Sequence, residues 1–147
     1  MPVGGIMLSN AINVPRLLLS GLAAGGWVLV SGLLMASAFG YRDMKAAFDA
    51  IGLPAPVGVA PFVVHTAVRL VTGMAVVTLF ALMLPVLSPI RALLTAAGFV
   101  WLLGALLPFV VMVEWGLFPW SLALKLWAWS GVELFVAGLI GKWIYSS

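Results

Sequence analysis

The chain has 147 residues, of which 65% are hydrophobic and only 7% are charged, and its mean hydropathy is +1.25. A soluble domain carries about 25% charged residues, so this composition excludes a water-soluble fold. Apolar runs close to the roughly 20 residues that a helix needs to cross a bilayer recur along the whole chain. The composition therefore predicts an all-α, polytopic membrane protein whose surroundings are the lipid bilayer.

Charge and cysteine content exclude several classes of function. Seven basic and four acidic residues give a formal net charge of +3. The basic residues form no cluster, so we expect no nucleic-acid partner. The absence of cysteine excludes disulfides, thiolate metal sites and cysteine nucleophiles. No phosphate-binding glycine loop or nucleophile motif is present either, so we expect no catalytic residues, no metal ion and no cofactor.

The first predicted span covers residues 16–40. Gly21 and Gly25 in it form a pair of small residues four apart, a spacing that lets membrane helices approach closely. The lead-in, residues 1–15, lacks a basic segment ahead of an apolar core, so we expect the first span to be retained rather than cleaved as a signal peptide.

Residues 41–51 predict a short interfacial helix. Met44, Phe48 and Ile51 fall on one face of this helix, and the charged residues fall on the others. The pattern is typical of a helix at the membrane surface, and Gly52 with Pro54 predicts its end.

Three further spans follow, at residues 61–84, 90–113 and 120–145. Pro61 suits the start of a helix, and Pro108 predicts a kink in the third span. The expected architecture is thus one transmembrane domain, a four-helix bundle with both termini on the same side. Lys and Arg are almost evenly shared between the two sides, and we take cytoplasmic termini as the expected orientation.

Two ionisable residues lie where lipid normally excludes charge. At a rise of about 1.5 Å per residue, Glu133 lies roughly 20 Å into the fourth span, and Arg69 lies roughly 12 Å into the second. A charge near the centre of a membrane helix costs about 2.5–3.5 kcal/mol on insertion scales, so each residue should have a partner or a wet cavity. His65 precedes Arg69 by one helical turn. We therefore expect a polar cluster of His65, Arg69 and Glu133.

Lys125 and Glu114 are the candidate residues for the mouth of this site. Lys125 lies nearer the membrane surface, where it can extend toward water or meet Glu114. The competing interpretation is structural: a buried Arg–Glu pair can simply hold two helices in register. The sole histidine, His65, is also a candidate axial ligand for haem or a chlorophyll-type pigment. Nothing in one chain supplies a second ligand, although a homodimer could supply one, and a hydrogen-bonded interfacial histidine is the favoured interpretation.

Several segments resemble one group of proteins. LSGLAAGGW, AAFDAIGLPAP, RALLTAAGFVWLLGALLP and GLFPWSL, followed by GVELFVAGLIGKWIY, are similar to a group of short, uncharacterised bacterial four-helix membrane proteins. The resemblance spans most of the chain and is most specific at the GLFP turn and the end of the last helix. It implies a four-helix topology and no activity. The expected location is a bacterial inner membrane.

Two functions stay open. The favoured one is a structural or accessory protein that acts by helix packing, as a homo-oligomer or within a larger membrane complex. The alternative is a small carrier or channel for a proton, an anion or a lipophilic molecule that uses Arg69 and Glu133. An enzyme is disfavoured because the chain has one histidine and no cysteine.

Overall fold

The computed structural model describes residues 12–147, and these residues form an all-α bundle. They contain four helical segments that are long and apolar enough to cross a membrane: Val14–Ala50, Val59–Met83, Pro89–Glu114 and Trp120–Ser146. The four-helix fold class is therefore confirmed. Most of residues 1–15, and with them the expectation about a retained first span, lie outside the described part of the chain.

The first segment is a single long helical rod. It consists of α1 (Val14–Met35), a π-helical turn η1 (Ala36–Gly40) and α2 (Tyr41–Ala50). The side chain of Asn13 caps its start by accepting a hydrogen bond from the Arg16 amide at 3.1 Å. The segment ends at Ala50, and Gly52, two residues further on, has a φ of +71°, a conformation that glycine adopts without a steric penalty.

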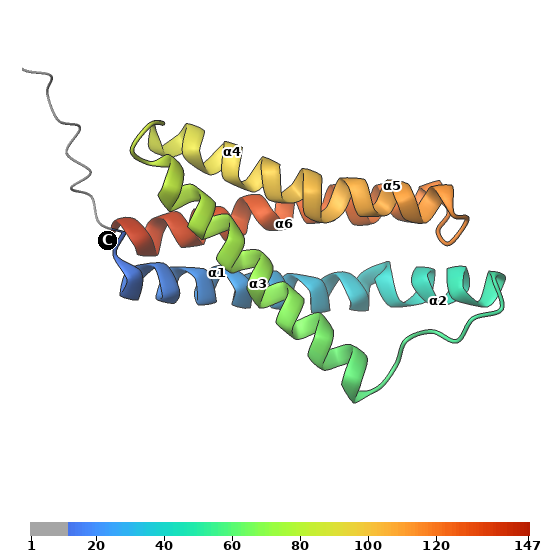
Figure 1. Cartoon of the computed structure of the whole chain (residues 1–147). Coiled ribbons are helices and arrows are strands. Elements are labelled where there is room, and N and C mark those ends of the chain that lie inside the picture. The colour runs from blue at the N-terminus through green and yellow to red at the C-terminus, as the bar shows by residue number, and fades with distance from the viewer. Residues whose placement is uncertain (1–11) are drawn as a thin grey trace, which may run out of the picture.

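The predicted interfacial helix forms as α2, but it continues the line of α1 instead of turning aside (Figure 1). Its apolar face explains this direction. Met44, Ala47 and Phe48 pack with Phe118, which precedes the last helix, and with Leu122 in its first turn. Burying this face against the bundle gives α2 the apolar partner that a membrane surface would otherwise supply.

The third segment contains the proline that predicts a kink. It consists of α4 (Pro89–Trp101), the π-helical turn η2 (Leu102–Leu106) and α5 (Leu107–Glu114). Pro108 stands in the first turn of α5, directly after η2. A proline cannot donate a backbone hydrogen bond, and the wider turn in front of it accommodates the missing bond while the helix continues.

The last helix, α6 (Trp120–Ser146), runs alongside α4 and α5 in the opposite direction and also packs against α1 (Figure 1). The start of α1 and the end of α6 lie at the same end of the bundle, as an even number of spans requires. One cluster of the buried core joins α1, α3, α4 and α6 and contains Ala24, Val28, Val76, Val77, Ala97, Leu134 and Ala137.

The helix α3 (Val59–Met83) crosses α1 obliquely, and glycines make this crossing possible (Figure 1). A Cβ on Gly25 would lie 2.8 Å from the Cα of Leu70. A Cβ on Gly73 would clash with the backbone of Gly25. The two backbones therefore touch where a side chain would separate them, in agreement with the close-packing role predicted for Gly25.

Candidate functional site

An ion pair joins α3 to α6 in the middle of the bundle. The guanidinium Nη1 of Arg69 donates to the carboxylate Oε1 of Glu133. The Glu133 side chain is 2% exposed and that of Arg69 is 20% exposed. Glu133 stands at the fourteenth of the 27 positions of α6. The carboxylate thus lies about midway through the last span, at a depth where an unpaired charge is costly.

Two further side chains, Ser31 and Trp27, bond to Glu133, and Trp129 bonds to Ser31. Ser31 on α1 donates to the second carboxylate oxygen, Oε2, at 3.4 Å. Trp129 donates its indole N–H to the hydroxyl of Ser31 at 2.9 Å, and Trp27 donates its own to the backbone carbonyl of Glu133 at 3.2 Å. The network therefore binds α1, α3 and α6 together.

Sequence reasoning did not assign Trp27, Ser31 or Trp129 to this site. A signal for them exists in the spacing. Trp27 and Ser31 are four residues apart on α1, and Trp129 and Glu133 are four apart on α6. Each pair therefore occupies one face of its helix, and the two faces meet.

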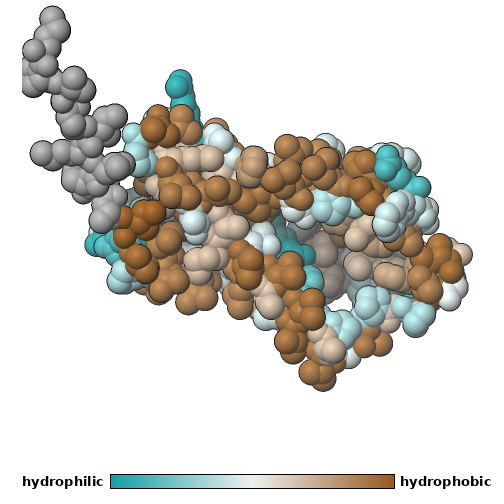
Figure 2. All heavy atoms as spheres, in the orientation of Figure 1, coloured by the Kyte–Doolittle hydropathy of each residue, from teal (hydrophilic) through white to brown (hydrophobic). Residues whose placement is uncertain are grey.

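His65 joins the network through Arg69. The Nε of Arg69 donates to Nε2 of His65 at 3.3 Å. In this contact Nε2 is the acceptor, so Nδ1 is the ring nitrogen left to donate. His65 also lines a cavity of about 420 Å³ between α1, α2 and the start of α3. Figure 2 shows hydrophilic atoms set back in a hollow beside α3, with hydrophobic surface around them.

The Arg69 side chain passes across α1 at a glycine. A Cβ on Gly32 would lie 3.1 Å from the guanidinium carbon of Arg69. Such a contact is tighter than side chains normally accept, so the absence of a side chain at position 32 opens the route from α3 to Glu133. Gly32 lines the cavity at His65, whereas the neighbouring Ser31 faces Glu133.

A second cavity, of about 560 Å³, lies between α1 and α6 on the Glu133 side. We call it the indole cavity. Its wall is mainly apolar and aromatic, with a few polar side chains. The lining residues are Trp27, Ser31, Leu34, Phe39, Lys125, Ala128, Trp129, Val132 and Glu133. This size, and a mainly apolar wall with few polar groups, are typical of small-molecule sites.

The two residues predicted for the mouth of the site lie in different places. Lys125 lines the indole cavity, but its ammonium pairs with Asp43 on α2 at 2.7 Å and not with Glu114. Glu114 is exposed at the end of α5 and forms no salt bridge within residues 12–147. The continuation of α1 into α2 explains the difference, because it brings Asp43 beside α6.

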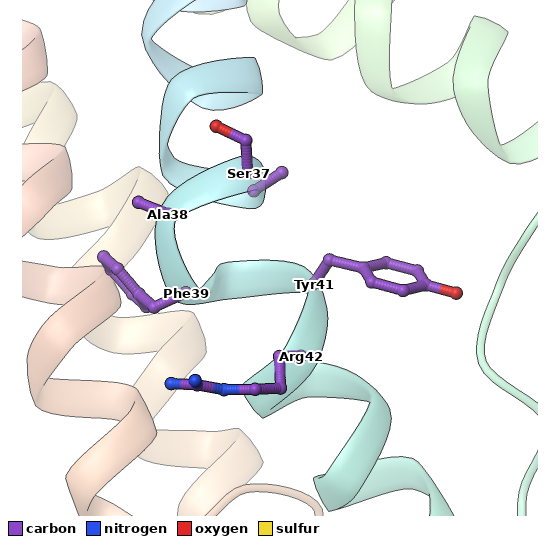
Figure 3. Close-up of a pocket in the computed structure, with 6 residues that line it drawn as sticks. Ser37, Ala38, Phe39, Tyr41 and Arg42 are labelled. Carbon is purple, nitrogen blue, oxygen red and sulfur yellow. The ribbon is translucent and has the colours of Figure 1, made fainter.

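A separate surface hollow lies along η1, lined by Ala36, Ser37, Ala38, Phe39, Tyr41 and Arg42. Figure 3 shows that Phe39 points toward the neighbouring helices while Tyr41 points away from them. One helical segment supplies all of the residues that line this hollow, so it does not enclose a ligand from two sides. Its relevance to the site is that η1 directs Phe39 into the wall of the indole cavity.

Within residues 12–147, no three His, Cys, Asp or Glu side chains approach closely enough to hold a metal ion. His65 keeps Nε2 occupied by Arg69, so haem ligation through that nitrogen would break the contact.

No protein-family model, curated protein sequence or solved structure matches the chain.

Proposed function

We propose that this chain is a small multi-pass membrane protein that binds a lipophilic molecule in the indole cavity and acts as its carrier. One observation supports the proposal above all others. A carboxylate that is almost fully buried, that of Glu133, borders an apolar cavity at mid-membrane depth. A molecule dissolved in the bilayer reaches this depth without crossing water.

The charge of the site agrees with such a ligand. Arg69 neutralises Glu133, and Asp43 neutralises Lys125. The cavity therefore offers polar contacts without an excess of charge, which a lipophilic molecule tolerates better than an ion does. A protein that needed Arg69 and Glu133 only to pair its helices would gain nothing from leaving space beside the carboxylate.

The test is binding to the purified protein in lipid nanodiscs. Two neutral lipophiles, para-butylphenol and para-butylanisole, are titrated by calorimetry, with empty nanodiscs as the reference. We expect saturable binding of at least one of them. The variant Val132→Trp places an indole in the cavity and should abolish binding.

The matched control is Val71→Trp. Val71 lies on α3 and is as exposed as Val132, at 67% against 69%, but it does not line the indole cavity. This variant should bind both compounds as the wild-type protein does. The proposal fails if neither compound binds saturably, or if the two variants lose binding equally.

The competing function is an accessory role in helix packing. The observation that favours it is that the network of Trp27, Ser31, Arg69, Trp129 and Glu133 links three helices whether or not the cavity is occupied. The double variant Arg69→Leu with Glu133→Leu separates the two functions. Suppose that this variant folds and reaches the membrane. If the Arg69–Glu133 pair serves only helix packing, the complex of this protein with its partner should still be isolated intact in mild detergent.

We further propose the finer identity that the sequence motifs indicate. The chain would belong to the group of short bacterial four-helix proteins that it resembles, and it would form a single transmembrane domain in the inner membrane with cytoplasmic termini. Four helices are few for moving a molecule between two sides, so carriage favours a homo-oligomer. Native mass spectrometry of protein extracted from its own membrane tests the oligomeric state.

A further inference from the structure

The polar groups that face the indole cavity are unequally satisfied. The indole N–H groups of Trp27 and Trp129 are both used, on the Glu133 carbonyl and the Ser31 hydroxyl. A carboxylate can accept about four hydrogen bonds, and within residues 12–147 that of Glu133 accepts two, from Arg69 and from Ser31. The bond from Ser31, at 3.4 Å, is long. The Glu133 carboxylate therefore has unused acceptor capacity, and a ligand in the cavity that carries a hydrogen-bond donor would satisfy it.

The charges argue against a cation as the source of that donor. A cationic ligand at Oε2 would be repelled by the guanidinium of Arg69, which already occupies Oε1 of Glu133. An anionic ligand would meet the carboxylate itself, and Lys125 is already paired with Asp43. A neutral donor adds a bond to Oε2 without disturbing either pair.

The wall of the cavity suits a flat ring. Trp27, Phe39 and Trp129 all line it, and the rings of Phe39 and Trp129 meet edge to face with centroids 6.0 Å apart. Aromatic side chains favour offset or edge-to-face contact with another ring. Leu34 and Val132 supply apolar contact for an alkyl substituent.

We infer that the ligand of the indole cavity is a neutral lipophilic phenol, whose hydroxyl donates to Oε2 of Glu133 while its ring packs against Trp27 and Trp129. This inference rests on the proposed binding function and specifies its ligand. It goes beyond that function because it states which chemical group the buried carboxylate recognises.

The test compares three probes of similar size on the wild-type protein in nanodiscs. Para-butylphenol carries the donor, para-butylanisole has a methyl group in its place, and para-butylbenzylammonium carries a donor with a positive charge. We expect the phenol to bind about tenfold or more tightly than the anisole, the ratio expected for one hydrogen bond to a charged acceptor. We expect the ammonium ion to bind more weakly than the phenol.

The double variant Arg69→Leu with Glu133→Leu is the second measurement. It removes the acceptor and leaves no unpaired charge, so the phenol and the anisole should bind it equally. The comparison in the wild-type protein stands by itself if this variant does not fold.

The outcomes distinguish this inference from the function on which it rests. Equal affinity for phenol and anisole in the wild-type protein, with both blocked by Val132→Trp, overturns the phenol and leaves lipophile binding standing. Tightest binding of the ammonium ion overturns the neutrality of the ligand. Saturable binding of neither the phenol nor the anisole overturns the lipophile-binding function as well.

Discussion

The guanidinium of Arg69 lies directly against Gly32, on its way from α3 to the carboxylate of Glu133 on α6. The ion pair at the centre of this protein therefore depends on a residue that carries no charge and no side chain.

Gly32→Ala should weaken the ion pair. The added methyl group would lie 3.1 Å from the guanidinium carbon, so either Arg69 or the helix must shift. Overpacking of this kind costs about 1–3 kcal/mol, and we expect a loss of about 1 kcal/mol in the free energy of unfolding because the guanidinium is the far end of a flexible side chain. This loss in the free energy of unfolding is measured by titrating the protein in mixed micelles with dodecyl sulfate and following its far-UV circular dichroism.

Gly26→Ala is the matched control on the same helix. A Cβ on Gly26 meets nothing within 4 Å in the described structure. This variant should be as stable as the wild type or slightly more stable, because alanine is the better helix former. Equal losses from the two substitutions would show that Arg69 does not need the space at Gly32.

Gly73→Ala should be more damaging than Gly32→Ala. Its methyl group would run into the backbone of Gly25, which cannot rotate away as a side chain can. We expect a loss at the upper end of the overpacking range, about 3 kcal/mol, measured by the same unfolding titration. Gly98→Ala on α4 is the control, since its Cβ has free space. A stable Gly73→Ala protein would mean that α1 and α3 do not cross this closely.

The two charges of the ion pair should behave as a unit. Arg69→Leu leaves Glu133 buried without its counter-charge, and Glu133→Leu leaves Arg69 without its own. Breaking a buried pair costs about 3–5 kcal/mol, and replacing both partners with apolar residues is often neutral. We therefore expect each single variant to unfold at a lower denaturant concentration and the double variant to recover most of the loss. Additive losses would show that the two residues act independently.

Two stacked indoles provide an optical test of the packing between α4 and α6. The rings of Trp101 and Trp127 lie 4.9 Å apart and almost parallel, at 3°. The N–H of Trp101 also donates to the backbone carbonyl of Trp127 at 3.0 Å. Trp101→Phe removes this bond and half of the stack, and should cost about 1–2 kcal/mol.

The near-UV circular dichroism spectrum reports the stack directly, because two closely held indoles couple their transitions. Trp101→Phe should reduce the tryptophan signal by more than the loss of one ring explains. Trp115→Phe is the control, since Trp115 is 76% exposed and should leave both the signal and the stability unchanged. A proportional loss of signal in both variants would argue that the stack does not persist in solution.

Much of the fold could be predicted from the composition and from the positions of proline and glycine. Long apolar runs indicated four spans, and Pro61, Pro89 and Gly52 stand at or near the boundaries of the observed helices. The direction of α2 could not be predicted in this way. An amphipathic helix needs an apolar surface to cover, and the sequence does not state whether that surface is the membrane or, as here, Phe118 and Leu122.

The candidate site likewise contains some residues that the sequence reveals and others that it does not. Arg69 and Glu133 stand out in the sequence because lipid penalises any charge at their depth. Trp27 and Ser31 do not stand out, because an aromatic or a hydroxyl side chain in a membrane helix is ordinary. The partner of Lys125 was open between water and Glu114 in the sequence, and it is Asp43 in the structure.

The sequence by itself determined that this chain crosses a membrane with four helices and carries two charges at its centre. The cost of placing polar groups in hydrocarbon depends on residue type and depth, and both can be read along a single chain. Only the tertiary structure decided which helices are neighbours and where space remains between them. Those properties depend on how side chains from distant segments fill a common volume, as Arg69 fills the space that Gly32 leaves open.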